Sequence, residues 1–185
     1  MNTIAAIGIG LPEPKRRPRS LEALESVYDQ IREPDDMLFA QDYSRMGEVA
    51  NMNRLLRATD CDWYAFVHDD DLWLPNHLLT CEKYFDVADV VVSRFDMVGR
   101  PWETIEPWHD DFHDLNWTNW IGSPSMVVVR ADTFGEWIGK RPGFRWNDWS
   151  QWQWLLQRGA RFADTRQVTT VYRFGDWSNG SWSAS

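Results

Sequence analysis

Three adjacent aspartates that follow an apolar segment are the residues best placed to do chemistry. Residues 63–67 read Trp-Tyr-Ala-Phe-Val, and His68, Asp69, Asp70 and Asp71 come directly after them. Carboxylates that converge at the end of a strand repel one another unless a cation neutralises them. Hard oxygen ligands suit Mg²⁺ or Mn²⁺, and Mg²⁺ is usually held by one or two carboxylates together with substrate phosphates. The cluster therefore indicates a divalent metal that carries a diphosphate.

The same aspartates also have a purely structural interpretation. Acidic side chains in the first turn of a helix are stabilised by the helix macrodipole, and the residues from Pro75 onwards predict a helix. Taken alone, the cluster fits a metal site and an acidic helix start equally well. The surrounding elements have to decide between the two.

Alternation of strands and helices predicts an α/β fold with a mostly parallel central sheet flanked by helices. We expect strands over residues 3–9, 37–40, 63–67, 89–93, 126–129 and 168–172, and helices over 21–31, 47–58, 75–85 and 148–157. Ligands of such sheets bind beyond the carboxyl ends of the strands. Both Asp42 and the aspartate cluster fall at such ends.

The first predicted helix has an apolar face and a candidate cap. Ser20 is a suitable N-cap residue. The apolar residues at helical spacing, which we expect to be buried, are Leu21, Leu24, Val27, Tyr28 and Ile31.

Length and composition favour a single domain without a membrane span. The 185 residues predict one domain over 1–175 and a flexible tail over 176–185. No apolar run approaches the about 20 residues of a transmembrane helix, and the N-terminus places apolar before basic residues, opposite to a secretory signal. We therefore expect a soluble, intracellular, cytoplasmic protein.

The net charge of −9 argues against a broad nucleic-acid-binding face. The local basic cluster is interpreted as a solvated loop; it comprises Lys15, Arg16, Arg17 and Arg19.

A second polar cluster and several tryptophans could form a ligand surface. His109 and His113 lie four residues apart, so a metal site is conceivable, but a solvated loop at the acceptor side is the favoured interpretation because no helical pattern supports the shared face. Tryptophans near polar clusters suit stacking on sugars or bases; they are Trp102, Trp108, Trp117, Trp120 and Trp146.

The order of motifs resembles that of family 2 glycosyltransferases, which have the GT-A fold. In that family an Ala-Arg-Asn helix precedes a strand that ends in an Asp-x-Asp motif, and a Trp-x-Pro helix start follows; here Asn53, the aspartate cluster and Leu-Trp-Leu-Pro occur in that order. Asn119–Ser125 is similar to the family's acceptor-side turn, and Asn147-Asp148 to its Glu-Asp helix start. Gly159–Phe162 and Tyr172-Arg173 are similar to the family's Gly-x-Arg-Phe and Tyr-Arg ending.

This resemblance implies transfer of a sugar from a nucleoside-diphosphate sugar, expected to be a UDP-sugar, to an acceptor hydroxyl with inversion. It implies a bound Mn²⁺ or Mg²⁺ held by Asp70 and Asp71, and a catalytic base at Asp148. The residues implied to contact the nucleotide-sugar are Asp42, Asn53 and Asp69.

The sequence also departs from the family pattern. His68 stands where Asp is common, Met52 where Arg is common, and Asn147 where Glu is common. We interpret His68 as a residue beside the metal ligands rather than one of them.

Several alternatives remain open from the sequence. Asp148 could be a helix N-cap, and Asn53 could cap a helix or bridge loops. The chain could be a catalytically silent carbohydrate-binding or assembly protein on a degenerate GT-A scaffold, or a nucleotidyltransferase, although the glycine-rich phosphate loop expected of the latter is missing. The acceptor could be a glycan, a protein, a small molecule or a nucleic acid.

Overall fold

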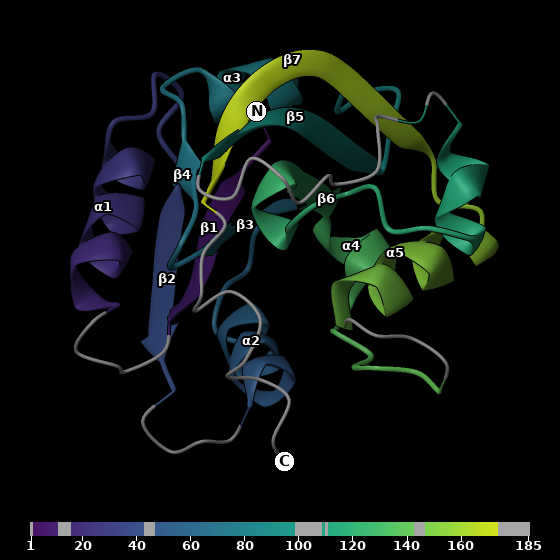
Figure 1. Ribbon diagram of the computed structural model, residues 1–185, viewed down its shortest axis with the longest axis horizontal. Coiled ribbons are helices and arrows are strands. Elements are labelled where there is room, and N and C mark those ends of the chain that lie inside the picture. Colours follow the sequence, from purple (N-terminus) through teal and green to yellow (C-terminus); the bar gives the residue numbers. More distant parts are fainter. Residues whose placement is uncertain are drawn as a thin grey trace.

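A single mixed sheet organises the chain in the computed structural model, which describes residues 2–10, 16–42, 47–98, 109, 111–142 and 147–173. Within these residues the strand order is β2-β1-β3-β6-β5-β7-β4 (Figure 1). The strands are β1 (Ile4–Gly10), β2 (Asp36–Gln41), β3 (Trp63–His68), β4 (Leu72–Trp73), β5 (Val90–Val98), β6 (Val127–Arg130) and β7 (Phe162–Arg173). The helices are α1 (Arg17–Tyr28), α2 (Glu48–Leu56), α3 (His77–Glu82), α4 (Ala131–Phe134) and α5 (Asn147–Gln157), with short 3-10 helices η1 (Phe112–Asn116) and η2 (Pro124–Met126).

Strand direction confirms the expected α/β architecture. β1 runs parallel to β2 and β3, and β5 runs parallel to β7, whereas β6 and β4 are antiparallel to their neighbours. Five of these seven strands therefore run in one direction. In the β1 pairings, Gly10 is opposite Gln41 and Ile9 is opposite His68. The residues that follow β2 and β3 thus emerge at one edge of the sheet.

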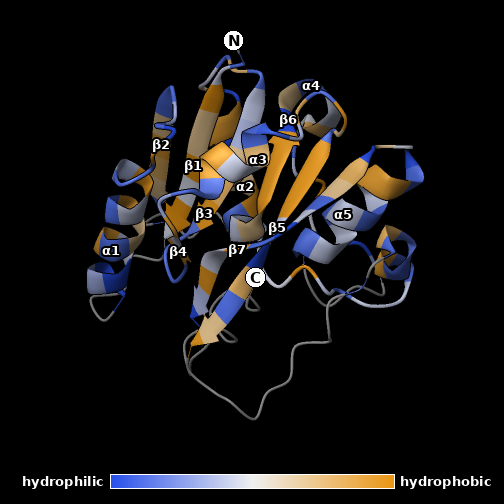
Figure 2. Ribbon diagram, turned by 90° about the horizontal axis from the view of Figure 1, so that it is seen from above, coloured by the Kyte–Doolittle hydropathy of each residue, from blue (hydrophilic) through white to orange (hydrophobic). Residues whose placement is uncertain are grey.

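Alternating side chains of the central strands build a core on each face of the sheet. Ala5, Ile7 and Ile9 of β1 join the core covered by α2, α4 and α5, while Ile4 and Ala6 join the core covered by α1 and α3. The central strands β1, β3, β5 and β6 accordingly show extended hydrophobic stretches (Figure 2). A strand whose two faces are both covered must be apolar on both, as the continuous apolar runs of β1 and β3 are.

The prediction for the first helix was wrong in its start and in most of its buried face, although Val27 is buried as expected. α1 begins at Arg17 with Arg16 at the N-cap position, so Ser20 lies inside the helix rather than capping it. Its buried residues are Ser20, Ala23 and Val27, and Leu21 and Tyr28 are 52% and 73% exposed. Small side chains let the helix approach the sheet closely, and Ser20 is buried because its hydroxyl donates to the Asp69 carboxylate.

Other elements differ from expectation where apolar patterns are absent. β7 is 12 residues long and begins at Phe162. The prediction started it at residue 168 because the first half of the strand is polar and shows no apolar run. β4, α4 and the two 3-10 helices were not predicted, and α3 begins at His77 rather than at Pro75. The expected tail lies outside the described residues.

We predict that Val27→Ala lowers the free energy of unfolding by about 2 kcal/mol, because Val27 is fully buried under the sheet. Leu21→Ala, a matched control on the same helix, should change it by no more than about 0.5 kcal/mol. Urea unfolding followed by circular dichroism measures both. Equal losses for the two variants would contradict the assignment of the buried face.

Candidate functional site

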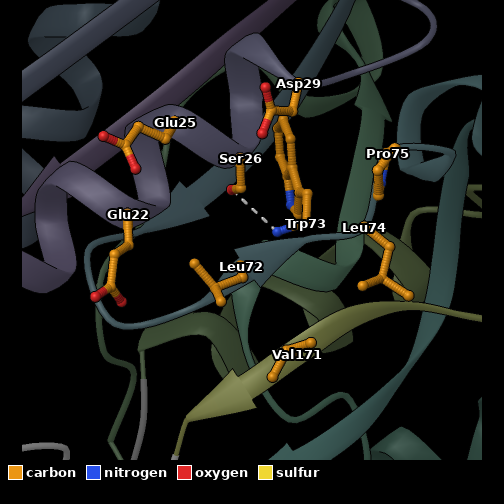
Figure 3. A pocket seen from close by; sticks show the side chains of 9 residues that line it. All are labelled: Glu22, Glu25, Ser26, Asp29, Leu72, Trp73, Leu74, Pro75 and Val171. Carbon is orange, nitrogen blue, oxygen red and sulfur yellow. Dashed lines mark hydrogen bonds between the residues drawn. The ribbon is translucent and has the colours of Figure 1, made fainter.

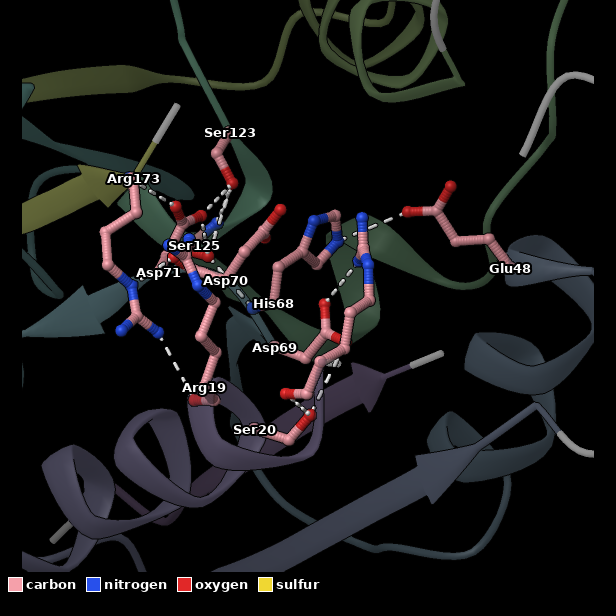
Figure 4. A network of polar contacts seen from close by, with 11 residues as sticks. Arg19, Ser20, Glu48, His68, Asp69, Asp70, Asp71, Ser123, Ser125 and Arg173 are labelled. Carbon is pink, nitrogen blue, oxygen red and sulfur yellow. Dashed lines mark hydrogen bonds and ion pairs between the residues drawn. The ribbon is translucent and has the colours of Figure 1, made fainter. Parts of the chain in front are cut away.

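The loop between β3 and β4 gathers four polar side chains at the carboxyl edge of the sheet (Figure 4). His68, Asp70 and Asp71 each offer a ligand atom, and these atoms all lie within 4.8 Å of one another. One imidazole and two carboxylates form a donor set that fits a divalent cation. The structure therefore brings together both aspartates predicted to bind metal, and it adds His68 to them.

Asp69 points away from this group towards α1. Its carboxylate accepts a hydrogen bond from Arg16 Nη1 at 3.0 Å, and both side chains are about 5% exposed or less. Ser20 Oγ donates to the other carboxylate oxygen at 3.5 Å. A buried carboxylate requires such a counterion. The interpretation of Arg16 as part of a solvated loop was therefore wrong, whereas its neighbour Arg17 is exposed.

Asp71 is fully buried beneath the loop. Its Oδ2 accepts hydrogen bonds from the hydroxyls of Ser123 and Ser125, each at 2.6 Å, and its Oδ1 lies 3.4 Å from the backbone N–H of Arg173. Burial and the neighbouring charge of Asp70 raise its pKa to about 7, against the two hydroxyl donors and the charge of His68. Its Oδ2 is thus occupied by the protein itself.

Arg173, the last residue of β7, ties the loop to α1. Its Nε donates to the Asp70 carbonyl, and its Nη2 donates to the Arg19 carbonyl at 3.2 Å. Its remaining nitrogen, Nη1, pairs with Glu22. The backbone of Asp70 is therefore held by the end of a strand that lies a hundred residues later in the chain.

Glu48, at the start of α2, connects the loop to α5. Its Oε1 lies 3.2 Å from His68 Nε2, and its Oε2 accepts a hydrogen bond from Asn147 Nδ2 at 3.3 Å. Burial opposes charge on both partners, but their mutual attraction prevails: the pKa of Glu48 is lowered, and that of His68 is raised to about 9. This bridge brings the starts of α2 and α5 to the end of β3.

Asp148 follows Asn147 in the first turn of α5. Its Oδ1 accepts from the Trp149 backbone N–H at 2.8 Å, and its Oδ2 accepts from Asn119 Nδ2 at 3.3 Å. Burial raises its pKa to about 6, with a further contribution from the charge of Glu48 and opposition from its hydrogen bonds and His68. Because Asp148 lies inside the helix, it is not the N-cap. The structure thus brings Asp148 within electrostatic reach of Glu48 and His68.

Asp42 and Asn53 are engaged in main-chain contacts. The backbone N–H of Asp42 donates to the Gly10 carbonyl at 3.1 Å, and its carboxylate accepts the Gly47 N–H at 2.9 Å, which links the end of β2 to α2. Asn53 exchanges two hydrogen bonds with the backbone of Trp137, at 2.7 and 3.0 Å. Asn53 thus bridges α2 to the loop after α4, close to one of its three sequence interpretations. Asp42 lies at the same sheet edge as the cluster.

Of the five tryptophans predicted to stack on a ligand, the structure describes two, and one of these is exposed. Trp102, Trp108 and Trp146 lie outside the described residues. Trp120 is 1% exposed and belongs to the core, so its proposed stacking on a ligand was wrong, whereas Trp117 is 82% exposed. His109 is partly buried, since it pairs with Asp114 at 2.7 Å and stacks on Trp120, whereas His113 is exposed as expected of a solvated segment.

A shallow cavity of about 260 Å³ lies elsewhere, between α1 and β4 (Figure 3). Glu22, Glu25 and Asp29 supply acidic groups from α1, and the apolar part of its lining includes Leu72 and Val171. Ser26 accepts the Trp73 backbone N–H at 3.1 Å at its edge. The acidic groups in this lining make the cavity unfavourable for an anionic ligand.

Sequence comparison with known families finds no match: no protein-family model and no curated protein sequence matches the chain. Solved structures do match. TarS residues 1–349 of S. aureus in complex with UDP-GlcNAc superposes with a TM-score of 0.72 at 13% identity, over 99% of this chain and 61% of that one. The mannosyltransferase PcManGT of Pyrobaculum calidifontis, in complex with GDP-Man and Mn²⁺, gives 0.66 at 15% identity, over 96% and 58%.

These neighbours are GT-A glycosyltransferases. The chain has the GT-A fold. It spans about 60% of the length of the neighbours. Among its described residues, no helix of this GT-A domain is both long and apolar enough to cross a membrane.

We predict that Arg16→Met destabilises the GT-A domain by about 3 kcal/mol or more, since it leaves Asp69 as a buried charge without its guanidinium partner. Arg17→Met, at the exposed neighbouring position, is the matched control and should have little effect. Chemical denaturation compares the two. The double variant Arg16→Met/Asp69→Leu should recover part of the lost stability. If Arg16→Met and Arg17→Met are equally stable, the pairing of Arg16 with Asp69 is refuted.

Proposed function

We propose that this domain transfers a sugar from a nucleoside-diphosphate sugar to an acceptor hydroxyl. The observation that carries the proposal is the Glu48 bridge, which joins His68 at the end of β3 to Asn147 beside Asp148. Candidate metal ligands and a candidate base from distant parts of the chain thereby surround one edge of the sheet. Neighbours of the same fold with UDP-GlcNAc or with GDP-Man and Mn²⁺ support a nucleotide-sugar as the ligand of that edge.

The residues present fit a divalent cation. Asp70 is the principal ligand in this proposal, since its carboxylate is partly exposed and has no hydrogen-bond partner among the described residues, and Asp71 lies beside it. When bound, Mn²⁺ or Mg²⁺ neutralises charge on a leaving diphosphate. Arg173 fixes the Asp70 backbone, so the ligand is positioned by two strands.

The nucleotide is proposed to lie along the ends of β1, β2 and β3. Asp42 is proposed to recognise the base from the end of β2. Asp69, with Arg16, is proposed to shape the ribose side of the site. We expect a UDP-sugar as donor, and Asn53 is proposed to support the site through its bridge to Trp137 rather than by touching the nucleotide.

Asp148 is proposed to act as the general base. Its pKa of about 6 leaves the carboxylate ionised at neutral pH yet more basic than an exposed aspartate, which suits removal of a proton from an attacking hydroxyl. Asn119 holds one carboxylate oxygen and thereby orients the group. A base that activates the acceptor directly implies single displacement, and hence inversion at the sugar carbon.

The proposal predicts metal-dependent nucleotide binding that requires Asp70. Calorimetric titration with UDP, GDP and their sugar conjugates, each in Mn²⁺ and in EDTA, should show binding of one nucleotide only with metal. Asp70→Ala should weaken that binding by about tenfold or more, because it removes the most accessible metal ligand. Asp60→Ala, which removes an exposed carboxylate, is the control.

Failure of every nucleotide to bind the folded protein would favour the silent-scaffold alternative. Release of pyrophosphate from a nucleoside triphosphate in the presence of a sugar phosphate would identify a nucleotidyltransferase instead.

Asp148→Asn should leave nucleotide affinity unchanged and reduce transfer or donor hydrolysis by about 100-fold or more. In the native protein the rate should rise with pH through about 6, because the base accepts a proton only once it is ionised. Nucleoside diphosphate release between pH 5 and 8 measures the loss of rate in the variant and the pH dependence of the native protein. A flat pH profile together with full turnover by Asp148→Asn would remove Asp148 from the mechanism.

A further inference from the structure

We propose that His68 is itself a metal ligand, that Glu48 holds its ring in the ligating orientation, and that this site therefore prefers Mn²⁺ to Mg²⁺. The inference rests on the proposed function, since it refines the metal site of that same reaction. It departs from the sequence interpretation, in which His68 lies beside the ligands without binding the metal.

The two ring nitrogens of His68 face different neighbours. Nε2 lies 3.2 Å from Glu48 Oε1, and the side chain is only 21% exposed. The ring stands between Glu48 on one side and Asp70 on the other (Figure 4), and one of its nitrogens lies within 4.8 Å of ligand atoms of Asp70 and Asp71. Because Nε2 faces Glu48, we assign Nδ1 as the nitrogen that belongs to the group formed with Asp70 and Asp71, and metal binding there displaces the Nδ1 proton to solvent.

The position of the ring is fixed from two directions. The His68 backbone N–H donates to Ser125 Oγ at 2.9 Å, which holds the main chain at the end of β3. Glu48 is held in turn by Asn147 at 3.3 Å, so it cannot swing away without losing that contact. Histidine ligands in metal sites usually donate their second N–H to a carboxylate in this way, which fixes the tautomer and makes the ligating nitrogen more basic.

The donor set determines which cation fits best. Imidazole nitrogen suits transition-metal ions, while Mg²⁺ prefers oxygen ligands in a near-ideal octahedron. Asp71 adds little to the oxygen ligands that Mg²⁺ requires, because its Oδ2 already accepts hydrogen bonds from two serine hydroxyls. One nitrogen, one accessible carboxylate and one largely engaged carboxylate therefore favour Mn²⁺.

The competing interpretation is that His68 and Glu48 form an ion pair with no metal role, and that only Asp70 and Asp71 bind the cation. Spectroscopy of bound Mn²⁺ separates the two, because an imidazole ligand gives a ¹⁴N modulation of the electron spin echo that carboxylates cannot give. The probe is Mn²⁺ alone, added to the full chain without nucleotide. Competition by Mg²⁺ against the free Mn²⁺ resonance gives the ratio of the two affinities.

We expect ¹⁴N modulation in the native protein and in His113→Gln, a control at an exposed histidine, and none in His68→Asp. His68→Asp should also lower the preference for Mn²⁺ over Mg²⁺ by about tenfold or more, and Glu48→Gln should keep the modulation while weakening Mn²⁺ binding by about tenfold. Thermal unfolding confirms that each variant is folded. Bound Mn²⁺ without ¹⁴N modulation, or no Mn²⁺ binding at all, would overturn the inference.

Calorimetry with UDP and GDP on the same samples separates this inference from the proposed function. A ¹⁴N signal without nucleotide binding would uphold the histidine ligand and refute the transferase. Nucleotide binding with Mn²⁺ but without the ¹⁴N signal would do the reverse.

Discussion

Concentration of negative charge at the end of β3 is the constraint on which the rest of the site depends. Asp69 and Asp71 are buried on opposite sides of the loop, and each has its own compensation: the Arg16 guanidinium for one, and two serine hydroxyls for the other. Removing a carboxylate from water is unfavourable unless such partners are present. In this loop Asp70 and His68 keep partial exposure while Asp69 and Asp71 are buried, so the buried pairs determine which groups face outwards.

The compensating groups come from separate elements, and this gives the fold its role in the chemistry. α1 brings Arg16, the turn before β6 brings the two serines, and β7 brings Arg173. Each of these elements is anchored by one of the two cores. The hydrophobic packing of the sheet therefore sets the geometry of the charges at its edge.

Much of this architecture could be predicted from the sequence, because apolar runs such as that of β3 report burial directly. The acidic cluster and Asp148 could be placed at one sheet edge by strand order and motif resemblance. The pairing of Arg16 with Asp69 could not, since the residues are 53 positions apart and an arginine cluster is usually solvated. The face of α1 was misjudged because its large apolar residues, Leu21 and Tyr28, are exposed while its small ones pack on the sheet. The first half of β7 carries no hydrophobic alternation, so its pairing with β5 depends on tertiary context.

The two oxygens of Glu48, each within 3.3 Å of a different partner, also make substitutions at this site interdependent. His68 and Asn147 meet Glu48 with nitrogen atoms, not with carboxylates. An acid at either position would place one carboxylate against another in a poorly solvated space unless a cation lies between them. Substitutions at positions 48, 68 and 147 should therefore be non-additive, because a neutral residue at 48 changes the cost of an acid at the other two.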